Sequence, residues 1–190
     1  IEYEAETTKA TIVNLTSHTY FNLRGAGNGN VLKHQLQLHA SNFTPIDPEL
    51  ETCGGDIQVT AGTPMDFTHA KEIGEAVNSS FDQIKLVAGL DHNFVLDHEG
   101  QEVGLAAQLQ EPESGRSLEV YTNQPGIQIY TGNHFDGTEQ GKGGQPIQQY
   151  GGVALETQIF PNSPNCDHYP NAILRPGEKY THTCIYKFGW

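Results

Sequence analysis

Hydrophobic and polar residues alternate with a period of two over most of the chain. The clearest alternating stretches are "YEAETT", "HQLQLHA", "DHNFVL", "GLAAQLQ", "SLEVYTN", "GIQIYTG", "GVALETQIF" and "YTHTCIYKF". Successive side chains of a strand point to opposite faces of a sheet, so this period predicts strands that are buried on one face. Turn-forming stretches such as "GAGNGN", "ESGR" and "RPGE" separate them. The pattern predicts an all-β protein, built as an antiparallel β-sandwich.

The longest alternating stretch, "ATIVNLTSHTYFNL", predicts one continuous strand. Leu15, Phe21 and Leu23 fall on a mainly apolar face, which we expect to pack into the sandwich. His18 falls on the opposite, polar face beside Tyr20. The only helix that we expect is short, around "HAKEIGEAVN", where three apolar residues can share one face.

Composition narrows the class of protein. A chain of 190 residues is long enough for one domain with a sizeable core. Its 23 acidic and 10 basic side chains give a formal charge of -13, which argues against nucleic acid and anionic membranes as partners. No apolar run is long enough to cross a bilayer. The cysteines, Cys53, Cys166 and Cys184, are odd in number and widely spaced, which favours reduced thiols and a cytoplasmic location.

Two strand residues are candidates for proton transfer. Glu156 shares its face with Ala154 and Phe160, and this partly apolar setting would raise the pKa of the carboxyl and make it a usable base. His18 would suit a general acid, because imidazole titrates near neutral pH. Both residues have a plainer interpretation, as polar side chains on a solvated or hydrogen-bonded face, and periodicity alone does not separate the two.

Asp91 follows a Gly-Leu turn, and Gln128 lies on the polar face of "GIQIY". Each could bind a ligand hydroxyl, or could serve only the turn and the cross-strand contacts around it. The nine histidines are scattered without the spacing of a zinc site, and neither a phosphate-binding loop nor a nucleophile elbow is present. We therefore expect no metal, and any catalysis to be proton transfer.

Several stretches, taken together and in order, resemble one family. They are "VNLTSHTYFNL", "TPID", "AGTPMDF", "GLDHNFVL", "SGRSLEVYTNQPGIQIYTGN", "GKGG", "GGVALETQ" and "LRPGEKYTHTCIYKF", and they run from about Tyr3 to Phe188. This order is similar to that of the aldose 1-epimerases, also called galactose mutarotases. The resemblance implies the galactose mutarotase-like supersandwich, an antiparallel β-sandwich.

The resemblance also implies roles for the four candidates. His18 would be the general acid on the ring oxygen of a hexose such as galactose or glucose, and Glu156 the general base on its anomeric hydroxyl. Asp91 and Gln128 would bind sugar hydroxyls. The monosaccharide would be the partner, and no cofactor would be needed.

Family members carry an upstream part that contributes an arginine and a second histidine to the sugar site. We therefore expect residues 1–190 to be the C-terminal portion of a single domain, incomplete at its N-terminal side and completed by a longer chain or a companion polypeptide. Two alternatives stay open, a catalytically inactive sugar-binding or regulatory module and a hexose-6-phosphate 1-epimerase. The stretch "ELETCGGDI" departs from the family pattern in a loop that we expect to lie away from the acid and the base.

Overall fold

The computed structural model describes residues 1–52, 56–98 and 102–190. Two six-stranded sheets dominate it. The back sheet has the order β1 (Glu2–Ala5), β14 (Tyr180–Gly189), β10 (Ser117–Thr122), β9 (Gly104–Gln110), β4 (Gln35–Leu38) and β7 (Lys71–Glu72). The front sheet has the order β3 (Tyr20–Phe21), β12 (Val153–Gln158), β11 (Gly126–Tyr130), β8 (Asp91–Val95), β5 (Asn42–Thr44) and β6 (Gln58–Val59).

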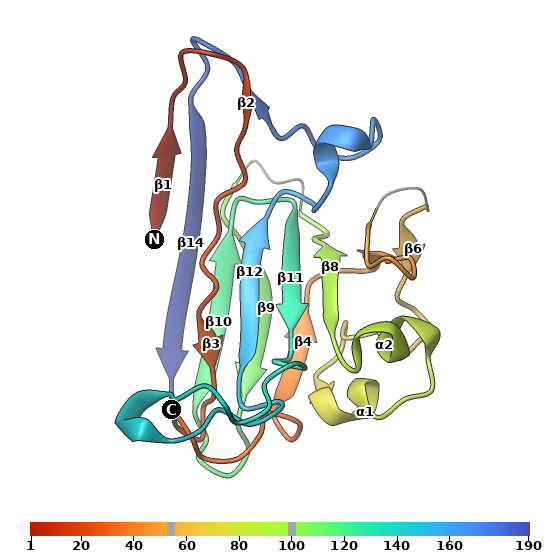
Figure 1. The fold of residues 1–190 in the computed structure, drawn as a ribbon, viewed down its shortest axis with the longest axis vertical. Helices are drawn as coiled ribbons and strands as arrows, with labels where there is room; N and C mark the ends of the chain where they lie inside the picture. Colours follow the sequence, from red (N-terminus) through yellow and green to blue (C-terminus); the bar gives the residue numbers. More distant parts are fainter. Residues whose placement is uncertain (53–55, 99–101) are drawn as a thin grey trace.

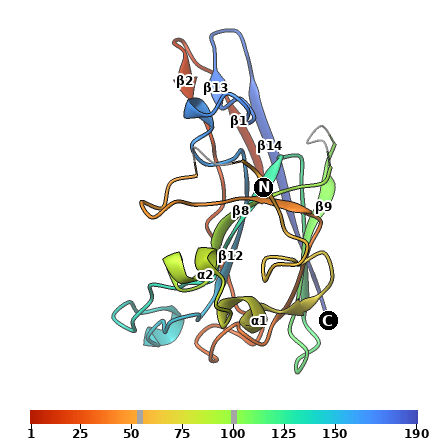
Figure 2. The ribbon, with the colours of Figure 1, turned by 90° about the vertical axis from the view of Figure 1, so that its right-hand side faces the viewer.

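Every pair of neighbouring strands in the two sheets is antiparallel. Figure 1 looks through both sheets, and Figure 2 shows them from the side, with β8 and β12 in one layer and β9 and β14 in the other. The prediction of an all-β antiparallel sandwich is therefore confirmed. The alternating stretches of the sequence became the long strands because one of their faces is apolar.

The remaining elements are short. A two-stranded sheet pairs β13 (Ile173–Leu174) with β2 (Thr11–Ile12), and it projects beyond the sandwich in both ribbon views. Two turns are 3-10 helices, η1 (Lys142–Gly144) and η2 (Ser163–Asn165). The expected helix is present as α1 (Ile73–Val77), and a second helix, α2 (Asp82–Val87), was not expected. Helices this short depend on tertiary packing, and both bury apolar residues against the sandwich.

The core fills the space between the sheets. It is built from the inward-facing residues of both layers, which pack as one cluster and include Leu36, Leu109, Leu118, Val120, Phe43, Phe94, Ile127, Ile129, Val153 and Leu155. In β11, Ile127 and Ile129 are fully buried, whereas Gln128 and Tyr130 between and after them point to the opposite, outer face of the front sheet. The core thus fixes which side chains of the front sheet face outward.

The strand expected over "ATIVNLTSHTYFNL" is wrong as a continuous element. Only β2 and β3 are regular strands, and residues 13–19 between them are not. The physical reason is visible at Asn14, whose side-chain amide bonds the backbone of Ile159 in both directions, at 2.8 Å and 2.9 Å. The Asn14 side chain makes the hydrogen bonds to Ile159 that the backbone of a neighbouring strand would otherwise make. Leu15 is 40% exposed, so the expected packing of its face into the sandwich fails at this residue.

The cysteines also differ from expectation. Cys166 is disulfide-bonded, and Cys184 is free and buried. Cys53 lies outside the described residues. The expectation of reduced thiols is therefore wrong at Cys166. Within the described ranges, no helix has the length and apolar character that a bilayer crossing demands.

Candidate active site

The three central strands of the front sheet bring three of the predicted residues onto one face. Gln128 on β11 is paired in register with Glu156 on β12. Asp91 on β8 is paired with Tyr130, two residues beyond Gln128 on the same face. Alternation turns all of these side chains away from the core. The sheet therefore gathers a base candidate and two hydroxyl-binding candidates that lie far apart in the sequence.

His18 joins this group from the segment that precedes β3. Its Nε2 lies 3.4 Å from Oε1 of Glu156. The His18 side chain is 52% exposed and that of Glu156 only 9% exposed, so the imidazole covers a largely buried carboxyl. All four predicted site residues thus lie in one region, although the strand that was expected to present His18 does not form.

Burial controls the electrostatics of the two carboxyls. Burial raises the pKa of Glu156, the nearby His18 opposes that rise, and the Asp91 carboxylate adds to it. Burial also raises the pKa of Asp91, which is opposed by a hydrogen bond from Nε2 of Gln128 to its Oδ1 at 2.8 Å. Two interacting carboxyls with raised pKa values, one facing an imidazole, form a site suited to moving protons.

An aromatic group beside the carboxyls was missed in the sequence. The rings of Tyr20 and Tyr130 lie 6.0 Å apart, and the His18 ring lies 4.9 Å from Tyr20 and 6.1 Å from Tyr130. Burial, together with Tyr130, Glu156 and Asp91, raises the pKa of Tyr20 to about 12, so its hydroxyl stays protonated near neutral pH. The signal was available, because Tyr20 and Tyr130 fall on the same strand faces as the predicted residues.

Asp91 is held in place by its neighbour in the chain. Leu90 donates its backbone N–H to Oγ1 of Thr131, and its carbonyl accepts a hydrogen bond from Nδ2 of Asn133, both at 3.0 Å. Gly89, with a φ of 156°, allows the chain to approach these side chains closely, since a Cβ here would lie 2.2 Å from Oδ1 of Asn133. The start of β8 is therefore fixed to the end of β11.

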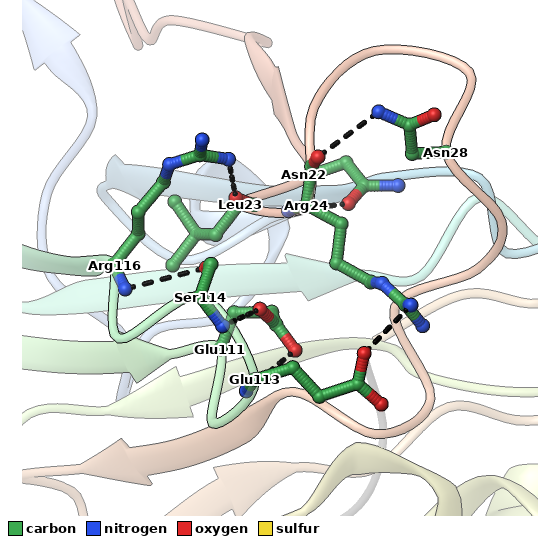
Figure 3. A network of polar contacts seen from close by, with 8 residues as sticks. All are labelled: Asn22, Leu23, Arg24, Asn28, Glu111, Glu113, Ser114 and Arg116. Atoms are coloured by element: carbon green, nitrogen blue, oxygen red, sulfur yellow. Dashed lines mark hydrogen bonds and ion pairs between the residues drawn. The ribbon is translucent and has the colours of Figure 1, made fainter.

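The chain beyond His18 and β3 is fixed at Leu23. Its backbone N–H donates to Nε2 of His34 at 3.0 Å, and its carbonyl accepts from Nη1 of Arg116 at 2.8 Å. Figure 3 shows this second contact within a wider polar network that also joins Arg24 to Glu113 at 2.8 Å. The network ties the segment that carries His18 to the back sheet.

A cavity of about 500 Å³ lies next to this site. The cavity and the site share Tyr20, whose ring lies 5.0 Å from that of Phe135, another residue of the cavity lining. The other lining residues include Phe21, Leu23 and Phe188, and none of the four predicted site residues lines the cavity. Across the described residues, no group of three or more His, Cys, Asp or Glu side chains is arranged to hold a metal ion.

Comparisons with known proteins agree with this architecture. The family model described as "Aldose 1-epimerase" matches residues 1–187. The chain is 42% identical to galactose mutarotase from Mus musculus over 188 residues, which cover 99% of this chain and 53% of the mouse protein. It is 37% identical to aldose 1-epimerase from Escherichia coli (strain K12), with coverage of 99% and 54%. The chain thus spans about half the length of the curated relatives it matches.

Solved structures lead to the same family. The galactose 1-epimerase from Lactobacillus acidophilus NCFM superposes with a TM-score of 0.81 at 35% identity, covering 99% of this chain and 52% of that protein. The aldose epimerase homologue from C. elegans superposes with a TM-score of 0.86 at 27% identity, with coverage of 99% and 55%. Since the family model spans nearly the whole sequence and these structures share its fold, the chain belongs to the aldose 1-epimerase family.

Proposed function

We propose that the protein is an aldose 1-epimerase that interconverts the α and β anomers of hexoses such as galactose and glucose. The observation that carries this proposal is the pairing of His18 with the buried Glu156 at 3.4 Å, beside Asp91 and Gln128. The anomeric hydroxyl and the ring oxygen O5 of a pyranose are bonded to the same carbon. An acid and a base that serve these two atoms must therefore lie close together, as these two side chains do.

The proposed reaction needs only two proton transfers. Glu156 removes the proton of the C1 hydroxyl while His18 gives a proton to O5, and the electron pair of the breaking C1–O5 bond goes to O5. The product is the open-chain aldehyde, with Glu156 protonated and His18 neutral. After rotation about the C1–C2 bond, the O5 hydroxyl attacks the other face of C1, and both protons return. No covalent bond to the protein forms.

The electrostatics of Glu156 suit its role as the base. The reaction requires an ionised Glu156 and a protonated His18, which is the ion-paired form of the contact. Burial raises the pKa of Glu156 and so strengthens it as a base, and the nearby His18 opposes that rise. In that form Glu156 can take one proton and His18 can give one.

An unsatisfied polar group at Gln128 supports a sugar site there. Oε1 of Gln128 is buried and has no hydrogen-bond partner within the described part of the chain, so it can accept from a sugar hydroxyl. Asp91 accepts from Gln128 through Oδ1 and can accept from hydroxyls through its other lone pairs. Tyr20 and Tyr130 offer ring surfaces for the apolar C–H groups of a pyranose.

Polarimetry on freshly dissolved α-galactose tests the proposal. The intact natural polypeptide should speed the change in optical rotation, and Glu156→Gln and His18→Asn should each lower kcat by about 10²-fold or more, because each removes one proton carrier. Equal rates for the three proteins would refute the assigned roles. Galactose binding without faster mutarotation would instead favour a sugar-binding or regulatory module.

We also propose that a polypeptide segment outside these 190 residues completes the sandwich. In the described part of the chain, β1 and β3 have a strand partner on one side only, which leaves backbone groups free for pairing. Large apolar side chains are exposed at Ile12, Ile185 and Phe188. Intact mass and size-exclusion chromatography should reveal a larger chain or a companion. A single active species of 20.8 kDa would refute this proposal.

A cytoplasmic location stays a prediction that rests on the odd number and wide spacing of the three cysteines. The disulfide at Cys166 argues against it, because disulfides persist mainly in oxidising compartments. Thiol titration of the natural protein under denaturing conditions would decide between the two. One reactive thiol for the three cysteines of this sequence would count against the cytoplasm, and three would support it.

A further inference from the structure

A polar row crosses the outer face of the front sheet beneath the proposed sugar position. Glu156 is paired in register with Gln128, and Gln128 is paired on its other side with Asn93. Directly paired side chains on one face have Cβ atoms about 4.5–5.5 Å apart. Asn93 is therefore as near a neighbour of Gln128 as Glu156 is. It was missed in the sequence, although alternation along β8 puts it on the same face as Asp91.

Asn93 carries an unusual set of unsatisfied groups. The residue is 0% exposed. Neither Nδ2 nor Oδ1 of Asn93 has a hydrogen-bond partner within the described residues, and the same is true of Oε1 of Gln128. Unpaired buried polar groups are costly and uncommon in folded proteins. Here one donor group and two acceptors lie on adjacent positions of one sheet face.

Asn93 has a polar neighbour on each side: Gln128 on β11, and Thr44 on β5, whose hydroxyl already donates to the backbone oxygen of Asn93 at 3.4 Å. A Cβ on Gly126 would lie 2.5 Å from Oδ1 of Asn93 and 2.9 Å from the Phe160 ring, so the glycine provides the space that the amide occupies. Phe160 belongs to a small apolar cluster with Tyr169, against which Val95 also packs. These apolar groups cannot satisfy an amide. Gln128, on the site side, can.

We propose that Asn93 is a positioning residue of the sugar site, whose Nδ2 donates to Oε1 of Gln128 when a sugar is bound. This inference rests on the proposed function. The Cβ–Cγ torsion of asparagine is soft, so the amide can turn toward Gln128 at little cost. A carbonyl oxygen accepts two hydrogen bonds, which leaves one lone pair of Oε1 for a sugar hydroxyl.

We call this arrangement, in which Asn93 positions Gln128 and Gln128 positions Asp91, the relay. Asn93 orients the amide of Gln128, and Gln128 in turn donates to Asp91 at 2.8 Å. Both groups that would bind sugar hydroxyls are then held by a residue whose own side chain is fully buried. Loss of Asn93 should weaken binding of the sugar and leave the proton transfers by His18 and Glu156 intact.

Steady-state mutarotation by the intact natural polypeptide tests the relay. Asn93→Leu should raise KM for galactose about tenfold, the effect of losing one buried hydrogen bond, and change kcat by less than about twofold. Its thermal midpoint should be no lower than that of the wild type, because an apolar side chain of similar size removes unpaired groups. Asn93→Ala provides a smaller variant should leucine not fit, and it should raise KM to the same extent.

A double-mutant cycle with Gln128→Ala separates the relay from a merely structural role. In that background Asn93→Leu should change KM by less than about twofold, since the effect passes through Gln128. The same fold-change in both backgrounds would overturn the proposal, as would an unchanged KM in the single variant. Thr44→Val is the matched control, because Thr44 is buried and paired with Asn93 on its far side. A tenfold rise of KM in that control would also overturn it.

Calorimetry with galactose keeps failure of the relay distinct from failure of the proposed activity. A wild-type protein that binds galactose without mutarotation would refute the enzymatic function alone. The relay would then stand on affinity, which Asn93→Leu should lower about tenfold. A wild-type protein with no measurable galactose binding would overturn the relay itself.

Discussion

Replacing Gly89 by alanine tests how Asp91 is positioned. The new methyl group would lie 2.2 Å from Oδ1 of Asn133 and 2.8 Å from Oγ1 of Thr131, and both distances are too short for real contacts. These two side chains hold the backbone of Leu90. The substitution must therefore displace the start of β8 or break its hydrogen bonds to the end of β11.

The magnitude follows from two contributions. A non-glycine residue at a φ of 156° costs roughly 1–3 kcal/mol in backbone strain. Loss of the two hydrogen bonds at Leu90 adds about 1 kcal/mol each. The expected loss of stability is therefore about 3–5 kcal/mol, which corresponds to a thermal midpoint lower by roughly 6–20 °C for a chain of this size. Because Asp91 moves with Leu90, KM for galactose should also rise.

Thermal unfolding followed by circular dichroism measures the first effect, and polarimetry measures the second. Gly62→Ala is the matched control, since Gly62 has a φ of 78° and a methyl group added there would have no other atom within 4 Å. The control should show only the strain, at about 1–2 kcal/mol, with KM unchanged. Equal shifts of the midpoint in the two variants would refute the collision with Asn133 and Thr131. An unchanged KM in Gly89→Ala would refute the link to Asp91.

Three further predictions concern the pKa values of Glu156 and Glu111 and the hydrogen bond that holds Leu23. The mutarotation rate should fall as pH drops through the raised pKa of Glu156. The acid limb of the pH–rate profile should therefore lie above the ordinary carboxyl pKa of 4.5, and a limb at or below that value would contradict the burial argument. Hydrogen bonds from Ser114 lower the pKa of buried Glu111 to about 2, so its stabilising effect is full above pH 4.5 and is lost as pH falls toward 2. Urea midpoints should show this acid loss in the wild type and not in Glu111→Gln. Arg116→Met, which removes the bond to Leu23, should lower kcat severalfold, whereas Lys187→Met at an exposed ion pair should not.

The long strands were predictable because each alternates cleanly. β12 shows both the strength and the limit of that signal. Alternation correctly placed Leu155 and Glu156 on opposite faces. All six residues of β12 are nevertheless buried, since its polar face is covered by side chains from elsewhere. A period of two separates faces, and it does not tell whether the polar face meets water.

The segment around His18 could not be predicted from alternation. The Asn14 side chain bonds the backbone of Ile159, and the backbone N–H of Leu15 donates to the Tyr180 hydroxyl. Such partners come from distant parts of the sequence. The helix α2 was missed, although Ile84, Val87 and the following Gly89 are spaced as a short helix and its end would require. The four site residues lie close together because three of them stand on paired strands. The resemblance to a family had already grouped them.

The burial of β12 on both faces has a consequence for how this site can be changed. Glu156 and the core residue Leu155 are adjacent in β12 and point to opposite faces of the sheet. A substitution at either position therefore disturbs the packing on the opposite face. Directed evolution of a new sugar preference should therefore recover few variants in this strand. Substitutions that alter sugar preference should concentrate at exposed positions around the site, such as His134, which neighbours the Tyr130 ring.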